Sequence, residues 1–367
     1  MLKNLRGRVV NKVEMHKFSF SKELQLHVLE IKPNRPFTSP VEFEESMQEA
    51  ALALQENVCH NFGARLLGTG MHPLLKLDET RVWPHRDRQI YKAYDEIFSL
   101  KRYGWVNIQS YQLNLPYSDE ESGVILHNLI ASVLPYLPAI AASSPAYEGR
   151  LGEDVDNRLR FYKENQREIP SITFDVIPEY AETFSDYREK VIGGYSKDLV
   201  MAGADKRLLY KEWINSRGVI FRFDRKALEI RVLDEQECVK SDVALSCFIR
   251  ALLRGLLKDE HHLIEREVLI NNFNSVVKDG FRAKVSDPRG KTAREVCSLL
   301  LKVADKNGSD EERKFIPLIR KRINNGSLSE IIRERIVRKA QRTDIREAML
   351  NIYLKLTESL IENRPYF

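Results

Sequence analysis

The chain has 367 residues, of which 43% are hydrophobic and 30% charged, a composition typical of a globular protein with a sizeable core. Its 58 Lys and Arg residues against 53 Asp and Glu residues leave a net charge of +5, an excess that suits an anionic small molecule but does not by itself indicate nucleic acid. The most apolar run, residues 123–142, contains His127, Pro135 and Pro138, and the N-terminus lacks the apolar stretch of a signal peptide, so we expect a soluble protein without a membrane span.

The first half of the chain combines strand patterns with two capped helices. Residues 39–42, Ser-Pro-Val-Glu, form a capping box with proline at the first helical position. In chain order we expect strands within 18–32, a helix from 40 to about 67, a glycine-rich turn at 68–73, a helix near 88–100, a strand at 106–115, and a long helix after Ser118 that breaks near Pro135 and Pro138.

The second half begins with an irregular segment, residues 142–206, and such a segment in a compact protein usually lines a site. A hairpin follows, with strands at 219–223 and 227–233. Beyond Asp242 we expect mostly helices, with caps at Thr292 and Ser309 and a stop at Gly326. We interpret the basic residues of this last third as a solvated helix face, with nucleic-acid binding as the alternative.

The four cysteines, Cys59, Cys238, Cys247 and Cys297, are scattered, without a CxxC pair or a His at metal-ligand spacing. Free thiols in a reducing compartment are the simplest interpretation. We therefore expect a cytoplasmic protein.

The second strand of the predicted hairpin carries the sharpest chemical signal. Alternation along Leu228–Asp234 places apolar residues on one face and Glu229, Arg231 and Leu233 on the other. A carboxylate two residues from a guanidinium on one face could place a metal ligand beside an anion clamp. The alternative is an ordinary solvent-facing strand with a salt bridge.

Glu23 and Glu30 are a second candidate pair, because two carboxylates suit Mg²⁺, which prefers oxygen ligands. Their separation of seven residues would place them on opposite faces of a straight strand. A bulge or bend would have to bring both to one site. Otherwise they are two unrelated surface glutamates.

Several weaker candidates complete the set. The turn at residues 68–73 lacks the ending of a P-loop and contains one histidine, His72, of a type that is more often structural than catalytic. Arg158, Arg160 and Arg217 are candidate clamps for phosphate or carboxylate, because guanidinium binds such groups bidentately. Spread over more than 200 residues, these side chains indicate a composite site across a sheet, as phosphoryl transfer and ligation require.

An ordered series of motifs resembles the second class of glutamate–cysteine ligases and their carboxylate–amine ligase relatives. The resemblance is close over roughly residues 20 to 260 and looser beyond. The motifs are Glu23-Leu24 with Glu30, Gly68-Thr69-Gly70-Met71-His72-Pro73, Glu79 to His85, Asn107-Ile108-Gln109-Ser110, Asn114-Leu115-Pro116, Leu134 to Pro138, Ala141 to Pro145, Glu212 to Gly218, and Glu229 to Glu237.

The resemblance implies an α+β fold in which helices cover a curved, mainly antiparallel sheet of glutamine-synthetase type, with ATP and divalent ions on its concave face. It implies an ATP- and Mg²⁺-dependent ligase of the kind that serves glutathione biosynthesis. Such an enzyme phosphorylates a glutamate-like acid to an acyl phosphate, which an amine such as cysteine then attacks.

The resemblance also implies roles for single residues. Glu23 and Glu30 look like ligands of one metal ion, and Glu229 like a ligand of the ion that orients the transferred phosphoryl group. Arg231 and Arg217 are the expected catalytic residues, with Arg231 as the clamp on that group. His72, Asn114 and Arg158 are the expected substrate-binding residues.

Two departures from the family pattern matter. Relatives begin with a Gly-Ile/Val-Glu-x-Glu strand whose glutamates bind metal, whereas Met1–Phe20 contains only Glu14. Relatives also carry a histidine ligand where this chain has Gln112, whose neutral amide we keep as a candidate metal ligand. The alternative function is therefore a catalytically impaired member that binds nucleotide or substrate in a regulatory role, or that needs a partner to complete its site.

For the organisation of the chain, we expect residues 1–260 to form the ligase-like core and residues 261–367 a helical subregion of the same unit. The expected partners are small molecules: a glutamate-like acid, an amine and ATP. We expect neither nucleic acid nor a membrane as a partner. The sequence leaves open the amine and the oligomeric state, including a homo-oligomer.

Overall fold

The computed structural model describes residues 2–3, 6–85, 87–258 and 263–367. The fold is α+β, as expected, and every strand pairing in the described residues is antiparallel. The strands are β1 (Lys12–Met15), β2 (Phe18–Lys22), β3 (Leu29–Pro33), β4 (Ser110–Pro116), β5 (Ala146–Tyr147), β6 (Arg150–Leu151), β7 (Val219–Arg222), β8 (Ala227–Asp234), β9 (Lys284–Asp287) and β10 (Gly290–Thr292).

Most of the chain is helical. The helices are α1 (Pro40–Phe62), α2 (Arg88–Phe98), α3 (Tyr103–Val106), α4 (Glu120–Val133), α5 (Leu137–Ala141), α6 (Asn157–Lys163), α7 (Pro170–Thr173), α8 (Phe184–Tyr187), α9 (Gly194–Met201), α10 (Val239–Leu256), α11 (Arg266–Asp279), α12 (Ala293–Asn307), α13 (Ile316–Asn325), α14 (Leu328–Ala340) and α15 (Ile345–Glu362).

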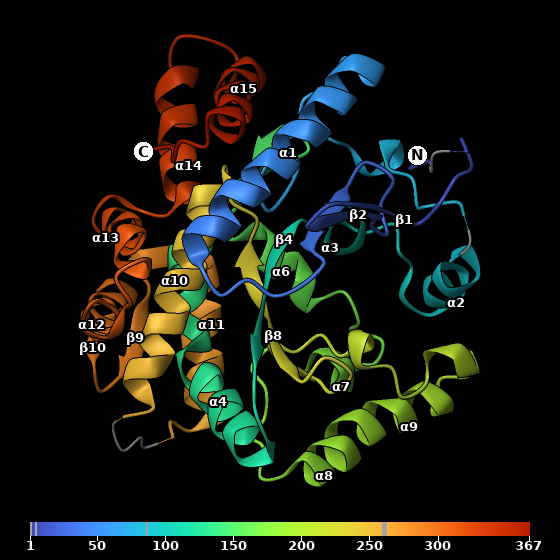
Figure 1. The fold of residues 1–367 in the computed structure, drawn as a ribbon, viewed down its shortest axis with the longest axis vertical. Helices are drawn as coiled ribbons and strands as arrows, with labels where there is room; N and C mark the ends of the chain where they lie inside the picture. Colours follow the sequence, from blue (N-terminus) through green and yellow to red (C-terminus); the bar gives the residue numbers. More distant parts are fainter. Residues whose placement is uncertain (1, 4–5, 86, 259–262) are drawn as a thin grey trace.

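Two three-stranded sheets organise the molecule, one of β1, β2 and β3 and one in the order β4-β8-β7. Strand β8 is the central strand of its sheet, and its apolar residues, including Leu228 and Ile230, are buried in the main core. Figure 1 shows α4, α10 and α11 gathered on one side of β8 and α7, α8 and α9 on the other. The connection between β2 and β3 contacts the segment before β4 through Gln25, whose side chain donates to the carbonyl of Ile108, 2.8 Å away.

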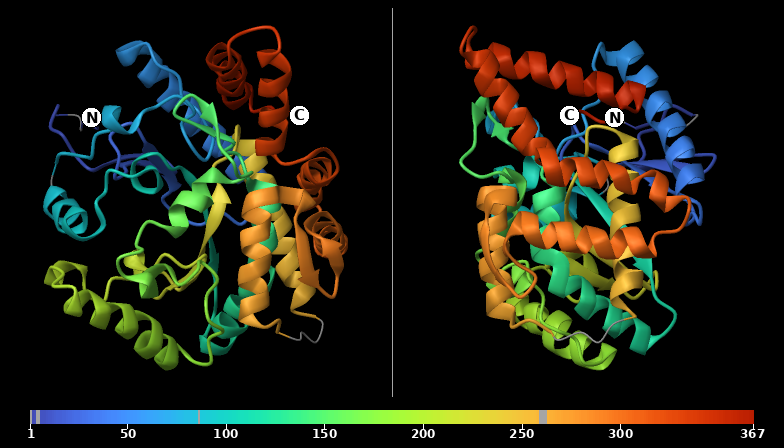
Figure 2. Two further views of the ribbon diagram at one scale, coloured as in Figure 1. Left: turned by 180° about the vertical axis from the view of Figure 1, so that it is seen from behind. Right: turned by 90° about the vertical axis from the view of Figure 1, so that its left-hand side faces the viewer.

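The C-terminal helices divide between two cores. Helices α11, α12 and α13 contribute Phe273, Leu300 and Ile319 to the main core, together with residues from the first half of the chain. Helices α14 and α15 pack on each other and on β5 around a second core that contains Ile332 and Met349. The two views of Figure 2 show this pair at one end of the molecule. The expected boundary between residues 260 and 261 lies outside the described residues.

Several sequence expectations are confirmed and a few boundaries are corrected. Ser39 caps α1 through its Oγ, which accepts from the amide of Glu42 at 3.1 Å, and Thr292 caps α12 in the same way. Helix α1 ends at Phe62 rather than near 67, because Gly63 adopts a left-handed conformation at its C-terminus. The short hairpin β9–β10 was not predicted, and the irregular segment contains several short helices.

The apolar segment at Glu120–Ala141 is long and apolar enough to cross a membrane by length and composition. In the structure it comprises α4, a single turn over Leu134–Tyr136 and α5, and 72% of its apolar window is buried inside the protein. Its residues Ile130 and Ile140 belong to the main core, as expected for a core helix.

Candidate functional site

Glu229 lies in the middle of the central strand β8. It pairs with Asn114 on β4 and with Ile220 on β7, so it is flanked by strands on both sides. Its side chain is 3% exposed, and its carboxylate forms ion pairs with three arginines. The Oε2 atom accepts from Nη1 of Arg222 at 2.7 Å and lies 3.9 Å from Nη1 of Arg225. Buried carboxylates require such partners, because an unpaired charge is costly to bury.

Arg231, two residues further along β8, contacts the same carboxylate, with 3.6 Å between its Nε and Oε1 of Glu229. Its guanidinium also donates to the carbonyl of Asn215. Burial disfavours the charge of Arg231, but Tyr162, Glu229, Tyr94 and Glu23 together outweigh this effect, and its pKa is raised. The expected Glu229–Arg231 pair is therefore present, and it faces neighbouring elements rather than bulk solvent.

Glu23 and Glu30 lie near the loop end of the β2–β3 hairpin, where their carboxylates influence each other electrostatically. Burial, and then the nearby carboxylate of Glu30, raise the pKa of Glu23 to about 7. Glu30 itself accepts from Ser21 at 2.5 Å and pairs with Lys32 at 2.6 Å. Glu23 also contributes to the raised pKa of Arg231, which links this pair to β8.

Gln112 and Asn114 point outward from β4, which borders β8. The register of the two strands shifts between Tyr111 and Leu113, where Gln112 lies opposite Arg231 and Val232. This irregularity breaks the alternation along β8. The prediction that Leu233 shares the face of Glu229 is therefore wrong: Leu233 is fully buried in the main core.

His72 lies half-buried in the glycine-rich turn, and its Nδ1 accepts from the amides of Leu74 and Leu75 at 3.2 and 3.0 Å. Burial lowers the pKa of His72, so the ring is neutral with its proton on Nε2. The side chain of Asn107 holds the turn by bonding both the amide and the carbonyl of His72, at 2.8 and 3.0 Å.

His27 is a neighbour of His72 that sequence reasoning missed. The two rings meet edge to face with their centroids 6.5 Å apart. Burial, and then the proximity of His72, lower the pKa of His27 to about 4. A histidine between Glu23 and Glu30 in sequence, close to His72 in space, could have been found only by knowing the β2–β3 connection.

The candidate clamps Arg158 and Arg217 are engaged by the protein itself. Arg217, 2% exposed, forms a two-point ion pair with Glu179, with Nε–Oε2 and Nη2–Oε1 distances of 2.7 and 2.8 Å. Arg158, 1% exposed, forms a buried ion pair with Asp234. Arg160 pairs at the surface with Asp154 at 3.3 Å. Direct substrate contact by Arg158 or Arg217 stays a prediction, which their burial does not favour.

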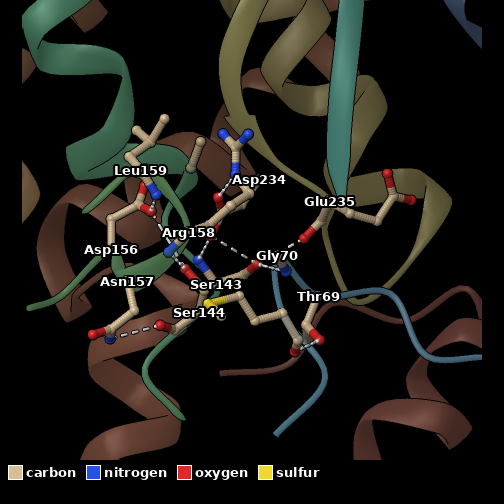
Figure 3. A network of polar contacts seen from close by, with 12 residues as sticks. Thr69, Gly70, Ser143, Ser144, Asp156, Asn157, Arg158, Leu159, Asp234 and Glu235 are labelled. Atoms are coloured by element: carbon tan, nitrogen blue, oxygen red, sulfur yellow. Dashed lines mark hydrogen bonds and ion pairs between the residues drawn. The ribbon is translucent and has the colours of Figure 1, made fainter. Parts of the chain in front are cut away.

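Figure 3 shows the polar network around Asp234, the last residue of β8. Its Oδ2 accepts from the amide of Ser143 at 2.8 Å, and Oγ of Ser143 accepts from the amide of Gly70 at 2.7 Å. A Cβ atom at position 70 would lie 2.3 Å from Oδ2 of Asp234, so only glycine permits this close approach. The network fixes the turn that carries His72 against the end of β8.

A divalent cation such as Mg²⁺ needs several oxygen ligands. Within the described ranges, no group of three or more His, Cys, Asp or Glu side chains is arranged to hold a metal ion. Glu23 and Glu30 nevertheless fit one, because their mutual repulsion would be offset by a hard cation that takes carboxylate oxygens. Glu229 does not fit in the same way, because both its oxygens already face arginines.

The sequence matches the family model of glutamate-cysteine ligase family 2 over residues 5–351. This chain belongs to that family. An uncharacterized protein of Archaeoglobus fulgidus is 44% identical to it over 366 residues, which is 100% of this chain and 93% of that protein.

Two solved structures show the same fold in carboxylate–amine ligases. The glutamate–cysteine ligase of Francisella tularensis, in complex with AMP, superposes with a TM-score of 0.61 at 13% identity, over 93% of this chain and 82% of that one. The Pup ligase PafA, in complex with ADP, superposes with a TM-score of 0.51 at 10% identity, over 94% of this chain and 70% of PafA. At these identities the likeness concerns the fold alone.

Proposed function

We propose that this family member is an ATP- and Mg²⁺-dependent ligase that joins a glutamate-like carboxylate to an amine such as cysteine. One observation carries the proposal: Arg231 contacts Glu229 on its own strand and lies within electrostatic reach of Glu23 beside the other sheet. Acidic and cationic groups from two sheets thus share one site, as ligation through a phosphorylated acid requires. Family membership and the nucleotide complexes of the two solved structures support the substrate class.

The proposed reaction has two steps. A carboxylate oxygen of the acid attacks the γ-phosphorus of ATP, the bond to ADP breaks, and an acyl phosphate forms. The amine then attacks the acyl carbon, phosphate leaves with the bonding electron pair, and the amide product remains after the amine loses a proton. Both steps build negative charge on phosphoryl oxygens, which preorganised cations stabilise.

Arg231 is the residue we assign to the transferred phosphoryl group, because its guanidinium is charged and only partly exposed. Glu229 supports it, since the carboxylate contacts Arg231 and Arg222 from within the strand pair. Glu23 and Glu30 would hold Mg²⁺, with the amide oxygen of Gln112 as a further ligand. When bound, the ion would neutralise charge on the phosphate oxygens.

Two further residues are assigned to substrate binding. Asn114 is exposed and lies directly opposite Glu229 in the β4–β8 register, so its amide can donate to an acid at the open face of the sheet. His72 can donate from Nε2, because Nδ1 is occupied by two backbone amides. The four free cysteines accord with the proposed cytoplasmic location.

The test is an assay with ATP, MgCl₂, glutamate and a panel of amines that includes cysteine. We expect ADP release that requires both the acid and an amine, and an amide product by mass spectrometry. Nucleotide binding by calorimetry without ADP release from any acid–amine pair would contradict the proposal and support the regulatory alternative.

A further inference from the structure

The backbone of Arg231 is held from both sides at the irregular point of β8. Its amide donates to the carbonyl of Gly218 at 2.9 Å. Its carbonyl accepts from Nη1 and Nη2 of Arg158, at 3.3 and 3.4 Å. A register shift removes regular ladder bonds at this place, so a carbonyl there needs another donor. Arg158 supplies that donor.

Arg158 cannot easily turn away from this carbonyl, because Asp234 holds its other edge. The ion pair from Nε of Arg158 to Oδ1 of Asp234 joins side chains that are 1% and 0% exposed. The second oxygen of Asp234 is bound by the amide of Ser143. In such a buried, fully bonded arrangement, one side chain cannot move without leaving a partner unpaired.

Helix α6 approaches both the backbone carbonyl and the side chain of Arg231. Arg158 and Tyr162 are four residues apart and therefore on one face of the helix. Tyr162 is 7% exposed, and in the described part of the chain its hydroxyl has no hydrogen-bond partner. It is also within electrostatic reach of the Arg231 guanidinium. One helical face thus approaches the carbonyl through Arg158 and the side chain through Tyr162.

We infer that Arg158 is a positioning residue for Arg231, and that it acts by holding the Arg231 carbonyl at the register shift rather than by touching substrate. The expected effect on kcat rests on the proposed function, whereas the expected effect on the Arg231 backbone does not. The same ion pair also anchors the turn of His72, because Asp234 holds Ser143 and Ser143 holds Gly70.

The kinetic test compares Arg158→Lys, Arg231→Lys and the double variant. Lysine keeps the charge opposite Asp234 but loses the fork that reaches the carbonyl. We expect Arg158→Lys to lower kcat by about ten- to a hundredfold, as expected for an active-site displacement of about 1 Å, while KM for ATP changes little. In an Arg231→Lys background the same change should have almost no further effect on kcat. Additive losses would overturn the inference.

Arg322→Lys is the matched control, because Arg322 forms another buried ion pair, with Glu237 at 2.6 Å, and has no contact with the Arg231 carbonyl in the described structure. We expect it to lower thermal stability to a similar degree and leave kcat unchanged. An equal loss of kcat in this control would mean that general destabilisation explains both variants.

A second readout does not require activity. Amide hydrogen exchange at Arg231 should accelerate by about tenfold or more in Arg158→Lys, because its bond to Gly218 depends on the held strand, and remain unchanged in Arg322→Lys. If the wild type is inactive but exchange is accelerated in Arg158→Lys, only the proposed function is contradicted. Unchanged exchange would defeat the positioning role. If Arg158→Lys does not fold, Asp234→Asn, which keeps the size and the bond to Ser143, is expected to accelerate the same exchange.

Discussion

The carboxylates of Glu23 and Glu30 interact although seven residues separate them in sequence. Strand β2 ends at Lys22, which pairs with Leu29 at the start of β3, so Glu23 leaves the strand where the chain turns back. Glu30 lies on the returning strand opposite Ser21. The chain therefore turns back between the two glutamates, and they do not lie on one straight strand.

Replacing Glu23 by Gln tests this pair through stability. The folded pKa of Glu23 is raised from 4.5 to about 7 by burial and by Glu30. Folding therefore favours the protonated form, and the stability associated with it is present below pH 4.5 and lost as pH rises through 7. We expect Glu23→Gln to raise the free energy of unfolding by about 1–3 kcal/mol at pH 8, and to change it little at pH 4.5.

Urea unfolding at the two pH values measures this effect, and Glu14→Gln, at an exposed glutamate, is the control. MgCl₂ at pH 8 should stabilise the wild type more than Glu23→Gln. A variant that is destabilised equally at both pH values would show that Glu23 carries an interaction other than repulsion from Glu30.

Glu229→Gln should damage both stability and activity. The change leaves Arg222 and Arg231 without their shared buried carboxylate, so we expect a loss of about 3–5 kcal/mol in the free energy of unfolding. Turnover of ATP should fall by about 10²–10³-fold, because Arg231 loses its support. Glu212→Gln is the matched control, since Glu212 contacts Arg222 at 3.5 Å from a half-buried position. Equal turnover in both variants would contradict the role given to Glu229.

Local patterns predicted the elements that carry the site, because their signals lie within a few residues. The β7–β8 hairpin follows from two β-rich runs around a short polar turn, and the start of α1 follows from Ser39. The same patterns could not reveal that Arg158 and Arg217 are buried, because their partners Asp234 and Glu179 lie 76 and 38 residues away. Long-range pairing decides whether an arginine is a clamp or a structural ion pair.

Sequence patterns could not predict the register shift in β8 either. Strict alternation predicted Leu233 beside Arg231, but one strand has an extra residue between the paired positions, and Leu233 turns into the core. Such an irregularity depends on how β4 pairs with β8, which the sequence of β8 alone does not contain.

The buried ring of His127 should make the stability of the fold sensitive to acid. Its ring is fully buried and stacked on Phe221 with centroids 4.9 Å apart, and burial lowers its pKa from 6.5 to about 4. The unfolded state binds a proton first, so this stability is present above pH 6.5 and is lost as pH falls through 4.

Between pH 7 and pH 4, the unfolding free energy should decrease by about 3 kcal/mol less in His127→Phe than in the wild type. Chemical denaturation across that range measures it, with His60→Gln as the control at an exposed histidine. A pH dependence that survives in His127→Phe would mean that other groups, such as His27, dominate acid unfolding.

Gln112 stands where the resemblance to the family implies a histidine ligand, and a substitution there tests whether this difference limits the chemistry. It is exposed on β4 opposite Arg231, so a replacement there reaches the proposed phosphoryl site without disturbing the core. The resemblance to the family implies that a histidine at this position belongs to the ligand set of the site. We expect Gln112→His to raise the rate of ADP release severalfold. This gain is smaller than the effect of one preorganised electrostatic group, which commonly lowers the barrier by about 3–4 kcal/mol.

The measurement compares the wild type, Gln112→His and Gln112→Ala at saturating ATP, glutamate and cysteine, over a series of MgCl₂ concentrations. Alanine should raise the MgCl₂ concentration needed for half-maximal turnover, because it removes the amide oxygen as a ligand. Below pH 6 the gain should fade, since a protonated imidazole cannot bind a cation. Robust wild-type turnover that histidine leaves unchanged or lowers would show that the site works with a different ligand set and that Gln112 is not its weak point.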